Sequence, residues 1–386
     1  MPKVVHLMRW FLPFTASFIR NQILYHRKYH PSVVFVEKDE GPFSREISKQ
    51  YETFYPIRTR LEKILYQKCR ILGPTVKKNI KNFIARENPD VLHVHYGVDC
   101  MVFSEAIRSL GIPTCVSFYG YDCTSFPKRF GGMGRTLLQK KVFENPNVHA
   151  ILAMTEDMKE DLMQLGCPEE KILVHYYGTE TAPFRQTRSY PEKEAIQFLI
   201  ISSFQEKKGH FFLIDAFERV SRSVDKQVSL HIVGGGELRQ AIQERIDRSG
   251  LGNIFLHGPV KYGSAQHVKM LADADVFVHP SIIPPDGEKE GIPGAIIEAM
   301  AAGLPVVSTF HAGIPHVTED GKSSLLCEEG DVEALAQNMI KLARDRDLRE
   351  RIGRAGQELA VRSLDVHEKE KELEAIYESL VTAHAV

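Results

Sequence analysis

Residues 290–308 read EGIPGAIIEAMAAGLPVVS and contain one complete change from helix to strand. Pro293 suits the first turn of a helix, where its missing N–H costs nothing, and Gly303 suits the left-handed exit. The apolar residues after Gly303 predict a strand at Val306–Ser308. A helix followed at once by a short apolar strand is the repeating unit of a parallel sheet.

The same alternation of short apolar runs and helical patterns continues outward through the chain. The predicted strands are Lys3–Met8, Pro31–Val36, Val91–His95, Thr114–Phe118, Ala150–Met154, Ile172–Tyr176, Gln197–Ser202, Ser229–Val233, Ile254–Leu256, Val276–His279 and Val306–Ser308. The predicted helices are Thr15–His26, Arg58–Arg86, Glu156–Leu165, His210–Val224, Glu237–Ser249, Ser264–Ala272, Pro293–Ala302 and Asp365–Leu380. The pattern predicts an α/β protein with two doubly wound parallel sheets.

A polar, proline-bounded segment without periodicity, Pro183–Pro191, separates the two series of strands and indicates a linker. We therefore expect a first domain at 1–185, a second at 186–364 and a C-terminal helix at 365–386 that packs back on the first domain. Two doubly wound domains facing each other leave a cleft at the carboxyl ends of their strands, where ligands bind in such sheets.

Composition excludes several classes of protein. The net charge of −1 makes no electrostatic case for nucleic acid. The six cysteines form no Cys-x-x-Cys pair, which fits a reducing compartment and gives no zinc signature. No apolar stretch approaches the ~20 residues that span a bilayer. We expect a cytoplasmic protein, with peripheral contact at the inner face of a membrane through the Arg58–Arg86 segment, where nine Lys/Arg face one acid.

Two carboxylates bracket the start of the helix in the opening stretch. Glu290 precedes this helix, and Glu298 lies inside it, about 7–8 Å along the axis from the helix start. Backbone N–H groups and the positive end of the helix dipole between them can hold a diphosphate. This spacing matches the length of a nucleotide sugar, with the sugar at one end, the phosphates in the middle and the ribose hydroxyls at the far end. The alternative is a capped amphipathic helix with a solvated acid at each place.

The segment Glu290–Glu298 resembles the Glu-x7-Glu motif of retaining glycosyltransferases of family 4. Further blocks resemble that family in collinear order from Ala150 to Glu329. They include LAMTEDMK at 152–159, SFQEKKG at 203–209, HIVGGGE at 231–237 and LHGPV at 256–260. In the first half, SFIRNQI at 17–23, HVHYGV at 93–98 and YGYD at 119–122 are similar to the colanic-acid type of exopolysaccharide glycosyltransferase.

The resemblance implies the GT-B fold, with two Rossmann-like domains. It implies transfer of a hexosyl unit from a nucleotide diphosphate sugar, a UDP-sugar in preference to GDP-mannose, to a hydroxyl on a glycan, lipid-linked or small-molecule acceptor. The front-face, retaining route attributed to such enzymes needs no metal and no cofactor, and the chain contains no Asp-x-Asp motif.

The same resemblance assigns roles to residues. Glu298 would bind the ribose, Glu290 would lie near the transferred sugar, and Lys208 would neutralise the diphosphate. Backbone N–H groups near Ile292, Pro293 and Gly294 would share that charge, and Gly258 and Val260 would approach the base. On the acceptor or sugar side we expect Phe14, Thr15, His95 and Asp122, although a turn-capping role for Asp122 is the alternative.

Two positions depart from the family pattern. Ser203 stands where the family usually has an arginine, and Tyr119 stands where many members have a histidine beside the donor sugar. Tyrosine donates a hydrogen bond but is a poor proton acceptor at neutral pH. These departures keep a second reading open, that of a catalytically degenerate partner subunit that binds nucleotide sugar. A nucleotide-sugar epimerase of the same fold is a third.

Overall fold

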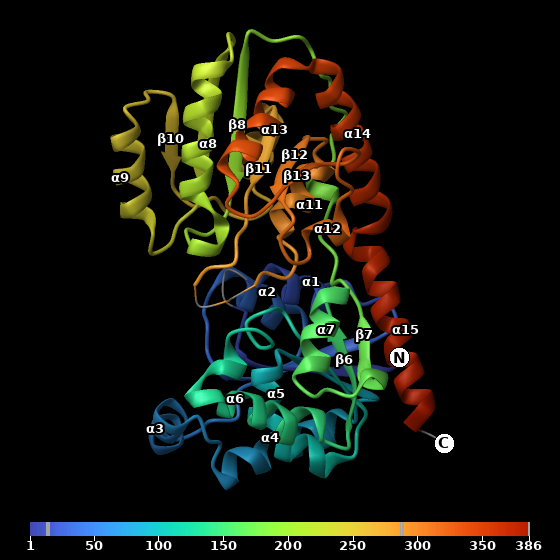
Figure 1. Ribbon diagram of the computed structural model, residues 1–386. Helices are drawn as coiled ribbons and strands as arrows, with labels where there is room; N and C mark the ends of the chain where they lie inside the picture. Colours follow the sequence, from blue (N-terminus) through green and yellow to red (C-terminus); the bar gives the residue numbers. More distant parts are fainter. Residues whose placement is uncertain (13–15, 286, 288, 385–386) are drawn as a thin grey trace. The chain divides into compact units, whose positions relative to one another are not determined.

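The computed structural model describes residues 1–12, 16–285, 287 and 289–384 (Figure 1). The chain forms two compact units: unit 1 comprises Met1–Gly178 and Val366–Val386, and unit 2 comprises Thr179–Asp365. The chain therefore passes between the units at 178/179 and again at 365/366. The boundaries expected from the sequence were 185/186 and 364/365.

The predicted linker Pro183–Pro191 packs on unit 2 instead. The Tyr190 hydroxyl donates a hydrogen bond of 2.6 Å to the carbonyl of Gly303, and Tyr190 is 7% exposed. Arg188 donates from Nη1 to the carbonyl of Leu271 at 3.1 Å. These polar side chains bind buried backbone carbonyls, and a composition argument cannot distinguish such a segment from a free linker.

Unit 1 is built on a seven-stranded parallel sheet with the order β3-β2-β1-β4-β5-β6-β7. Its strands are β1 (Lys3–Trp10), β2 (His30–Glu37), β3 (Thr53–Phe54), β4 (Val91–His95), β5 (Thr114–Ser117), β6 (Val148–Ala153) and β7 (Ile172–Val174). Strand β4 is buried along its whole length. The order reverses between β1 and β4, so the carboxyl ends of these two strands form the switch point where ligands bind in doubly wound sheets.

The helices of unit 1 are α1 (Ser17–Leu24), α2 (Pro42–Gln50), α3 (Arg60–Cys69), α4 (Pro74–Glu87), α5 (Gly97–Leu110), α6 (Met133–Leu138), α7 (Glu156–Gln164) and α15 (Val366–His384). The prediction of one helix over Arg58–Arg86 is wrong. Arg70 adopts a left-handed backbone (φ 55°) after α3, and Pro74 begins a new helix after Gly73. Proline has no N–H to continue the preceding helix, which separates α3 from α4.

The two basic helices differ in burial. Val76, Ile80 and Ile84 of α4 are buried. Leu61 of α3 is 76% exposed, and Ile64 and Leu65 are also exposed. Helix α3 therefore presents apolar and cationic side chains to solvent together. No helix in the described part of the chain is long and apolar enough to cross a membrane.

Unit 2 contains a six-stranded parallel sheet with the order β10-β9-β8-β11-β12-β13. Its strands are β8 (Ala195–Ile201), β9 (Gln227–Val233), β10 (Ile254–His257), β11 (Val276–His279), β12 (Val306–Thr309) and β13 (Leu325–Cys327). Its helices are α8 (His210–Ser223), α9 (Arg239–Ser249), α10 (Ala265–Asp273), α11 (Gly294–Ala301), α12 (Ile314–Val317), α13 (Val332–Arg344) and α14 (Arg346–Ser363). The switch point lies between β8 and β11. The predicted class, two doubly wound α/β domains, is confirmed.

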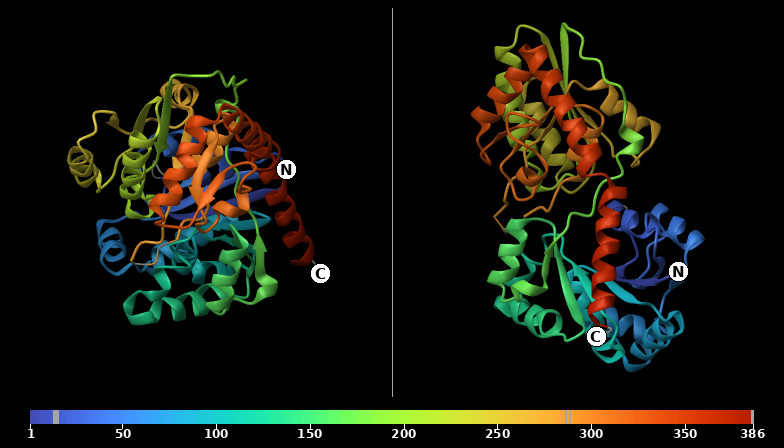
Figure 2. Two further views of the ribbon diagram at one scale, coloured as in Figure 1. Left: turned by 45° about the horizontal axis from the view of Figure 1, so that its top comes forward. Right: turned by 90° about the vertical axis from the view of Figure 1, so that its right-hand side faces the viewer.

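The C-terminal helix α15 belongs to unit 1, as predicted, and lies along it in the right-hand view of Figure 2. Leu373 and Tyr377 of α15 are fully buried in one cluster with Val4, Tyr29 and Val91. Completely burying such side chains stabilises a fold by about 1.5–3 kcal/mol each, so the last helix is part of the core of unit 1.

Candidate active site

Two loops meet at the switch point of unit 2. The first follows β8 and carries Lys208, and the second follows β11 and leads to Glu290. The backbone N–H of Ile282 donates to the carbonyl of Lys207 at 3.0 Å, which ties the two loops together. Gly209 adopts a left-handed backbone (φ 67°), and a β-carbon there would lie 1.9 Å from the carbonyl oxygen of Pro280. Only glycine permits this approach.

Lys208 and Glu290 form a buried ion pair in the place where these loops meet. Nζ of Lys208 lies 2.5 Å from Oε1 of Glu290, with 14% and 6% of the two side chains exposed. Burial alone would raise the pKa of Glu290, but the Lys208 ammonium and the neighbouring His279 outweigh it and hold the pKa well below its ordinary value. Glu290 is therefore a carboxylate at neutral pH and no proton donor.

Groups that sequence reasoning missed surround Glu290. The Ser281 hydroxyl donates to Oε2 of Glu290 at 3.2 Å, and Nε2 of His279 lies 3.8 Å from the same oxygen. Burial lowers the pKa of His279, with Lys208 acting in the same direction and Glu290 opposing it. A signal was available, since both residues lie at the carboxyl end of a predicted strand, where ligand-binding groups gather.

A second set of contacts fixes the loop backbone. The N–H of Glu290 donates to Nε2 of His311 at 3.2 Å, so the ring proton of His311 resides on Nδ1. That Nδ1 lies 2.7 Å from Oε1 of Glu329, and Oε2 of Glu329 accepts from the N–H of Ile283 at 2.7 Å. Glu329 and His311 thus hold both ends of the loop that presents Glu290.

Helix α11 begins at Gly294 after Pro293, and Glu298 lies within it. Ile292 is 4% exposed and Pro293 is also buried. Oε2 of Glu298 lies 3.3 Å from Nε2 of His267, whose Nδ1 accepts from the N–H of Gly263 at 3.3 Å. As predicted, Glu290 precedes the helix and Glu298 lies inside it. His267 orients Glu298 but was not predicted.

The other donor-side candidates lie at the same edge of the sheet. Ser203 follows β8 and donates from its hydroxyl to Oε1 of Gln205 at 3.2 Å. Gly258 and Val260 follow β10; Gly258 is exposed, and a β-carbon added to it would meet nothing within 4 Å. The predicted base-binding segment is therefore open to a ligand.

In unit 1, Tyr119 and Asp122 follow β5, and His95 ends β4. Nδ1 of His95 lies 2.9 Å from the half-buried Tyr119 hydroxyl. Burial raises the pKa of Tyr119 well above its ordinary value. The Asp122 carboxylate accepts from the N–H groups of Gly97 at 2.8 Å and Tyr119 at 3.1 Å, so it holds the loop that carries Tyr119. Burial raises the pKa of Asp122 to about 6, against these N–H donors.

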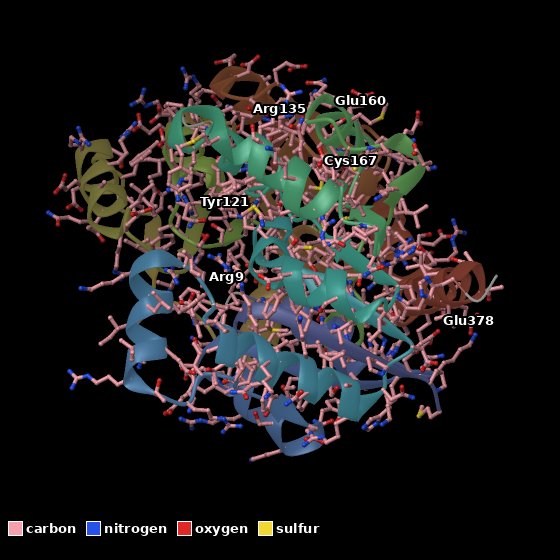
Figure 3. All side chains as sticks on the ribbon, turned by 90° about the horizontal axis from the view of Figure 1, so that it is seen from below. Arg9, Tyr121, Arg135, Glu160, Cys167 and Glu378 are labelled. Carbon is pink, nitrogen blue, oxygen red and sulfur yellow. The ribbon has the colours of Figure 1, made fainter. Side chains whose placement is uncertain are left out.

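The predicted acceptor residues Phe14 and Thr15 lie outside the described residues. A pocket of about 900 Å³ is present in unit 1 at the switch point between β1 and β4. Arg9, at the end of β1, and Tyr121 are two of its lining residues and are labelled in Figure 3. The lining combines six cations with apolar side chains and one acid: Arg9, Lys68, Arg70, Ile71, Leu72, Lys77, Val98, Met101, Val102, Glu105, Tyr121, Phe126, Arg129, Phe130, Leu137 and Lys141.

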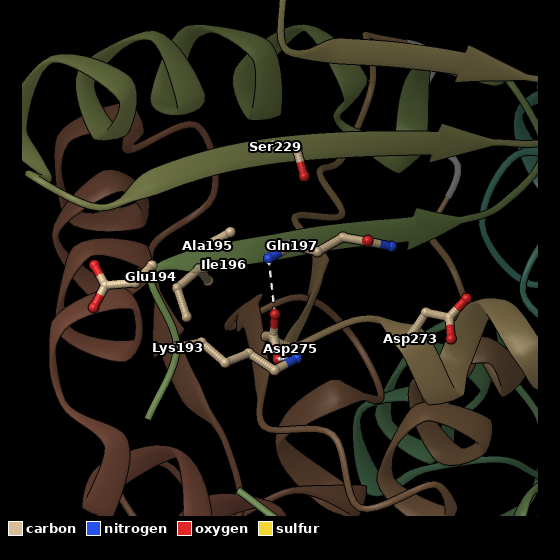
Figure 4. A pocket seen from close by; sticks show the side chains of 8 residues that line it. All are labelled: Lys193, Glu194, Ala195, Ile196, Gln197, Ser229, Asp273 and Asp275. Atoms are coloured by element: carbon tan, nitrogen blue, oxygen red, sulfur yellow. Dashed lines mark hydrogen bonds and ion pairs between the residues drawn. The ribbon is translucent and has the colours of Figure 1, made fainter. Parts of the chain in front are cut away.

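A smaller pocket of about 380 Å³ in unit 2 lies at the opposite, amino-terminal edge of the sheet (Figure 4). Asp275 occupies it, accepting from the backbone N–H of Gln197 at 3.0 Å and from Lys193 at 2.6 Å. Ligands of doubly wound sheets bind at the other edge, and Asp275 is held here by Lys193 and by the backbone of Gln197. This pocket is therefore structural.

Comparison with known families identifies the fold. Residues 23–182 match the model described as Glycosyltransferase Family 4, and residues 184–359 match the model described as Glycosyl transferases group 1. The chain belongs to glycosyltransferase family 4. The family predicted from the Glu290–Glu298 segment is thereby confirmed.

Relatives of this family 4 chain include proteins named for amylovoran and colanic acid biosynthesis. The amylovoran biosynthesis glycosyltransferase AmsK of Erwinia amylovora is 30% identical over 286 residues, which is 72% of this chain and 66% of the relative. The putative colanic acid biosynthesis glycosyltransferase WcaL of Salmonella typhimurium is 31% identical over 258 residues, 66% of this chain and 62% of the relative. The matches span less than two thirds of either relative's own length.

Among solved structures, this family 4 chain is similar in fold to Anabaena Alr3699/HepE, crystallised in complex with UDP and glucose. The TM-score is 0.78 at 17% identity, over 98% of this chain and all of that one. A glycosyltransferase from Rickettsia africae gives a TM-score of 0.77, also at 17% identity, with 98% of each chain covered. These similarities confirm the GT-B fold, with two Rossmann-like domains.

Proposed function

We propose that this chain transfers a hexosyl unit from a UDP-sugar to a hydroxyl acceptor, with retention at the anomeric carbon, in exopolysaccharide biosynthesis. The observation that carries the proposal is the Lys208–Glu290 pair at the switch point of unit 2, in a chain of glycosyltransferase family 4. The relatives named for colanic acid and amylovoran biosynthesis support the pathway, and the HepE complex with UDP and glucose supports the donor class.

Lys208 is suited to the leaving group. The diphosphate gains negative charge as the glycosidic bond breaks, and a preorganised ammonium stabilises that charge in the transition state. The start of α11, at Ile292–Gly294, adds backbone N–H groups and a helix dipole. With these donors in place no metal ion is needed, and the reaction should proceed in EDTA.

Glu290 acts as a carboxylate. Since its pKa lies well below the ordinary value, it accepts hydrogen bonds from sugar hydroxyls and faces the positive charge that develops at the anomeric carbon. Glu298, oriented by His267, binds the ribose hydroxyls. The acceptor hydroxyl attacks from the face that the phosphate leaves, which preserves the configuration.

The acceptor is an amphiphile with an anionic head, such as a lipid-linked pyrophosphate sugar. Support comes from the pocket at the switch point of unit 1, where cations including Arg9, Arg70 and Arg129 lie beside apolar walls. The exposed Leu61, adjoining the cations of α3, would rest on an anionic membrane surface that holds such an acceptor.

The test is a nucleotide-release assay over a panel of UDP- and GDP-sugars, with EDTA present throughout. We expect one UDP-sugar to release UDP, Glu290→Ala to abolish release, and the exposed Glu244→Ala on α9 to leave it unchanged. Release that requires added metal would contradict the metal-free mechanism. An inverted anomeric configuration of the product, determined by NMR, would contradict retention.

The alternative of a binding-only partner subunit rests on Ser203, which leaves the diphosphate site one cation short of the family pattern. Tight binding of a UDP-sugar with no turnover, for any acceptor in anionic vesicles, would favour that alternative. Turnover that depends on Glu290 excludes it.

A further inference from the structure

Four buried histidines gather in unit 1, outside the donor site. His6 on β1 pairs in register with His93 on β4, and His95 follows two residues later on the same face. His6, His93 and His95 are all fully buried. His26, just after α1, has a side chain with no solvent exposure.

Three of these rings, His95, His6 and His26, form an unbroken line of contacts, here called the histidine chain. Nε2 of His95 lies 2.9 Å from Nδ1 of His6. Nε2 of His6 lies 3.0 Å from Nε2 of His26. At one end Nδ1 of His95 meets the Tyr119 hydroxyl at 2.9 Å. At the other end Nδ1 of His26 lies 2.7 Å from Oε1 of Glu370, which is an ion-pair distance without hydrogen-bond geometry.

The two ends have different properties. Glu370, on α15, is 1% exposed, and burial raises its pKa, against the opposing effects of His26 and His175. Its neighbour Glu374 accepts backbone N–H groups of Arg27 and Lys28, both at 2.7 Å, and so caps that turn. Tyr119 is half-buried and lies in the loop after β5.

A metal site is the competing interpretation, because nitrogen atoms of His6, His93 and His95 lie within 4.8 Å of one another. Every ring nitrogen of these residues already has a partner, however. The nitrogens of His93 meet the Tyr377 hydroxyl at 2.6 Å and the Ser117 hydroxyl at 2.8 Å. A metal ion would have to break these contacts, so the arrangement favours a hydrogen-bonded chain.

The chain has two proton arrangements that differ by one proton. With Glu370 ionised, Nδ1 of His26 carries the proton that lies nearest Oε1 of Glu370, the next two rings donate in the same direction, and Tyr119 donates to His95. With Glu370 protonated, every bond reverses, His95 donates from Nδ1 to Tyr119, and the phenol donates to Oε1 of Gln22, 3.1 Å away. In both arrangements each histidine is neutral.

We propose that the histidine chain is a proton relay that carries the proton of the acceptor hydroxyl from Tyr119 to Glu370. The phenol oxygen receives the acceptor proton while its own proton passes to His95, and one proton is shifted at each ring until one reaches Glu370. The acceptor oxygen forms the new bond to the anomeric carbon, and the electron pair of the breaking sugar–phosphate bond leaves with the diphosphate. The proton returns to solvent after product release.

This inference rests on the proposed function, since it adds a destination for the acceptor proton besides the leaving phosphate. The pKa values agree with it. Burial, with a smaller contribution from His26, lowers the pKa of His95 to about 3, and burial lowers that of His6 well below the ordinary value. His95 and His6 therefore change tautomer without becoming cations. The Tyr119 phenol accepts one proton as it donates another, so it need not ionise. The weak basicity of tyrosine therefore does not prevent the transfer.

The test uses the full chain labelled with ¹⁵N-histidine, in which NMR reports the tautomer of each ring. As the pH falls through the titration of Glu370, the proton of His95 should move from Nε2 to Nδ1. Glu370→Gln cannot take up a proton, so the tautomer of His95 should become independent of pH. Glu378→Gln, an exposed change on the same helix, should titrate like the native protein.

Turnover supplies the second readout. Glu370→Gln should lower kcat by about tenfold or more, in line with the loss of proton-transfer assistance. KM for the donor should stay within about twofold, and the solvent deuterium isotope effect should fall. His6→Phe interrupts the relay at its centre and should have the same effect, with its melting temperature checked first.

The outcomes separate the two proposals. A His95 tautomer that does not change with pH in the native chain overturns the relay. A Glu370→Gln variant with the kcat and pH profile of the native chain also overturns it. Stoichiometric zinc bound to purified protein and lost in His6→Phe also overturns it. A pH-dependent tautomer in a protein that turns over no donor supports the relay's proton path and refutes the proposed function instead.

Discussion

A β-carbon placed on Gly209 would lie 1.9 Å from the carbonyl oxygen of Pro280. This contact joins the loop after β8 to the end of β11, and it brings Lys208 and Glu290 within 2.5 Å of each other. The left-handed backbone of Gly209 and the close carbonyl are two separate reasons for glycine at this position.

Gly209→Ala should therefore lower stability by about 2–4 kcal/mol, because a non-glycine residue is strained there and the loops must also separate. UDP binding should weaken with it. The matched control is Gly250→Ala, where φ is 69° but a β-carbon meets nothing within 4 Å. It should cost only about 1 kcal/mol. Melting temperatures and titration calorimetry with UDP measure both; equal losses would contradict the role of Pro280.

Lys208→Ala should destabilise unit 2 by about 3–5 kcal/mol at neutral pH, since it leaves the Glu290 carboxylate buried without its nearest cation. The pKa of Glu290 is lowered in the folded chain, so the pair's stabilisation is present above the unfolded value of about 4.3 and is lost as pH falls toward the folded value. The difference in unfolding free energy from the native protein should therefore shrink below about pH 4.

Chemical denaturation at pH 3 and pH 7 measures that difference. The control is Lys322→Ala, which breaks an exposed pair with Glu319, 2.6 Å long, and should change stability by less than about 1 kcal/mol at either pH. A Lys208→Ala cost that is the same at both pH values would show that Glu290 is not its electrostatic partner.

Local pattern was enough to predict the helix of Glu298, the loop position of Glu290 and every strand of the described residues except the short β3 and β13. Each of these depends on neighbours in sequence, such as Pro293 before the helix and Gly303 after it. The break at Gly73–Pro74 was missed because the basic, apolar pattern continues across it, although proline itself argues for a boundary.

What local pattern could not reveal is contact between distant residues. The hydrogen bond between His311 and Glu329 and the close contact between His26 and Glu370 join side chains from separate elements. The strand ends offered partial clues, since His279 and His311 both follow apolar runs. Nothing near Glu370 in the sequence, which reads as one acid among many on an amphipathic helix, indicated that it is buried.

Membrane contact through α3 gives a further prediction. Replacing Lys63 and Lys68 by alanine should weaken binding to vesicles of anionic phospholipid by about 10- to 30-fold, at about 1 kcal/mol per charge. Binding of the native chain should also fall with added salt. Alanine at Lys269 and Lys322, two exposed cations of unit 2, is the matched control. Flotation of vesicles measures each variant, and equal binding by all of them would exclude α3 as the contact.

Ser203→Arg would restore the cation that the family pattern has at this position. The Ser203 hydroxyl donates to Oε1 of Gln205 at 3.2 Å in an exposed contact, so a longer side chain at this position breaks no buried bond. A charge-assisted contact to the diphosphate contributes about 1.5–3 kcal/mol, so UDP affinity should rise by about 10- to 100-fold. Gln205→Arg, an exposed change two residues away, should raise the affinity for UDP far less.

Calorimetry with UDP at two salt concentrations separates a direct contact from general electrostatic attraction, because salt screens general attraction while a direct contact persists. No gain from Ser203→Arg would mean that the diphosphate does not reach the loop after β8, and that Lys208 has another role.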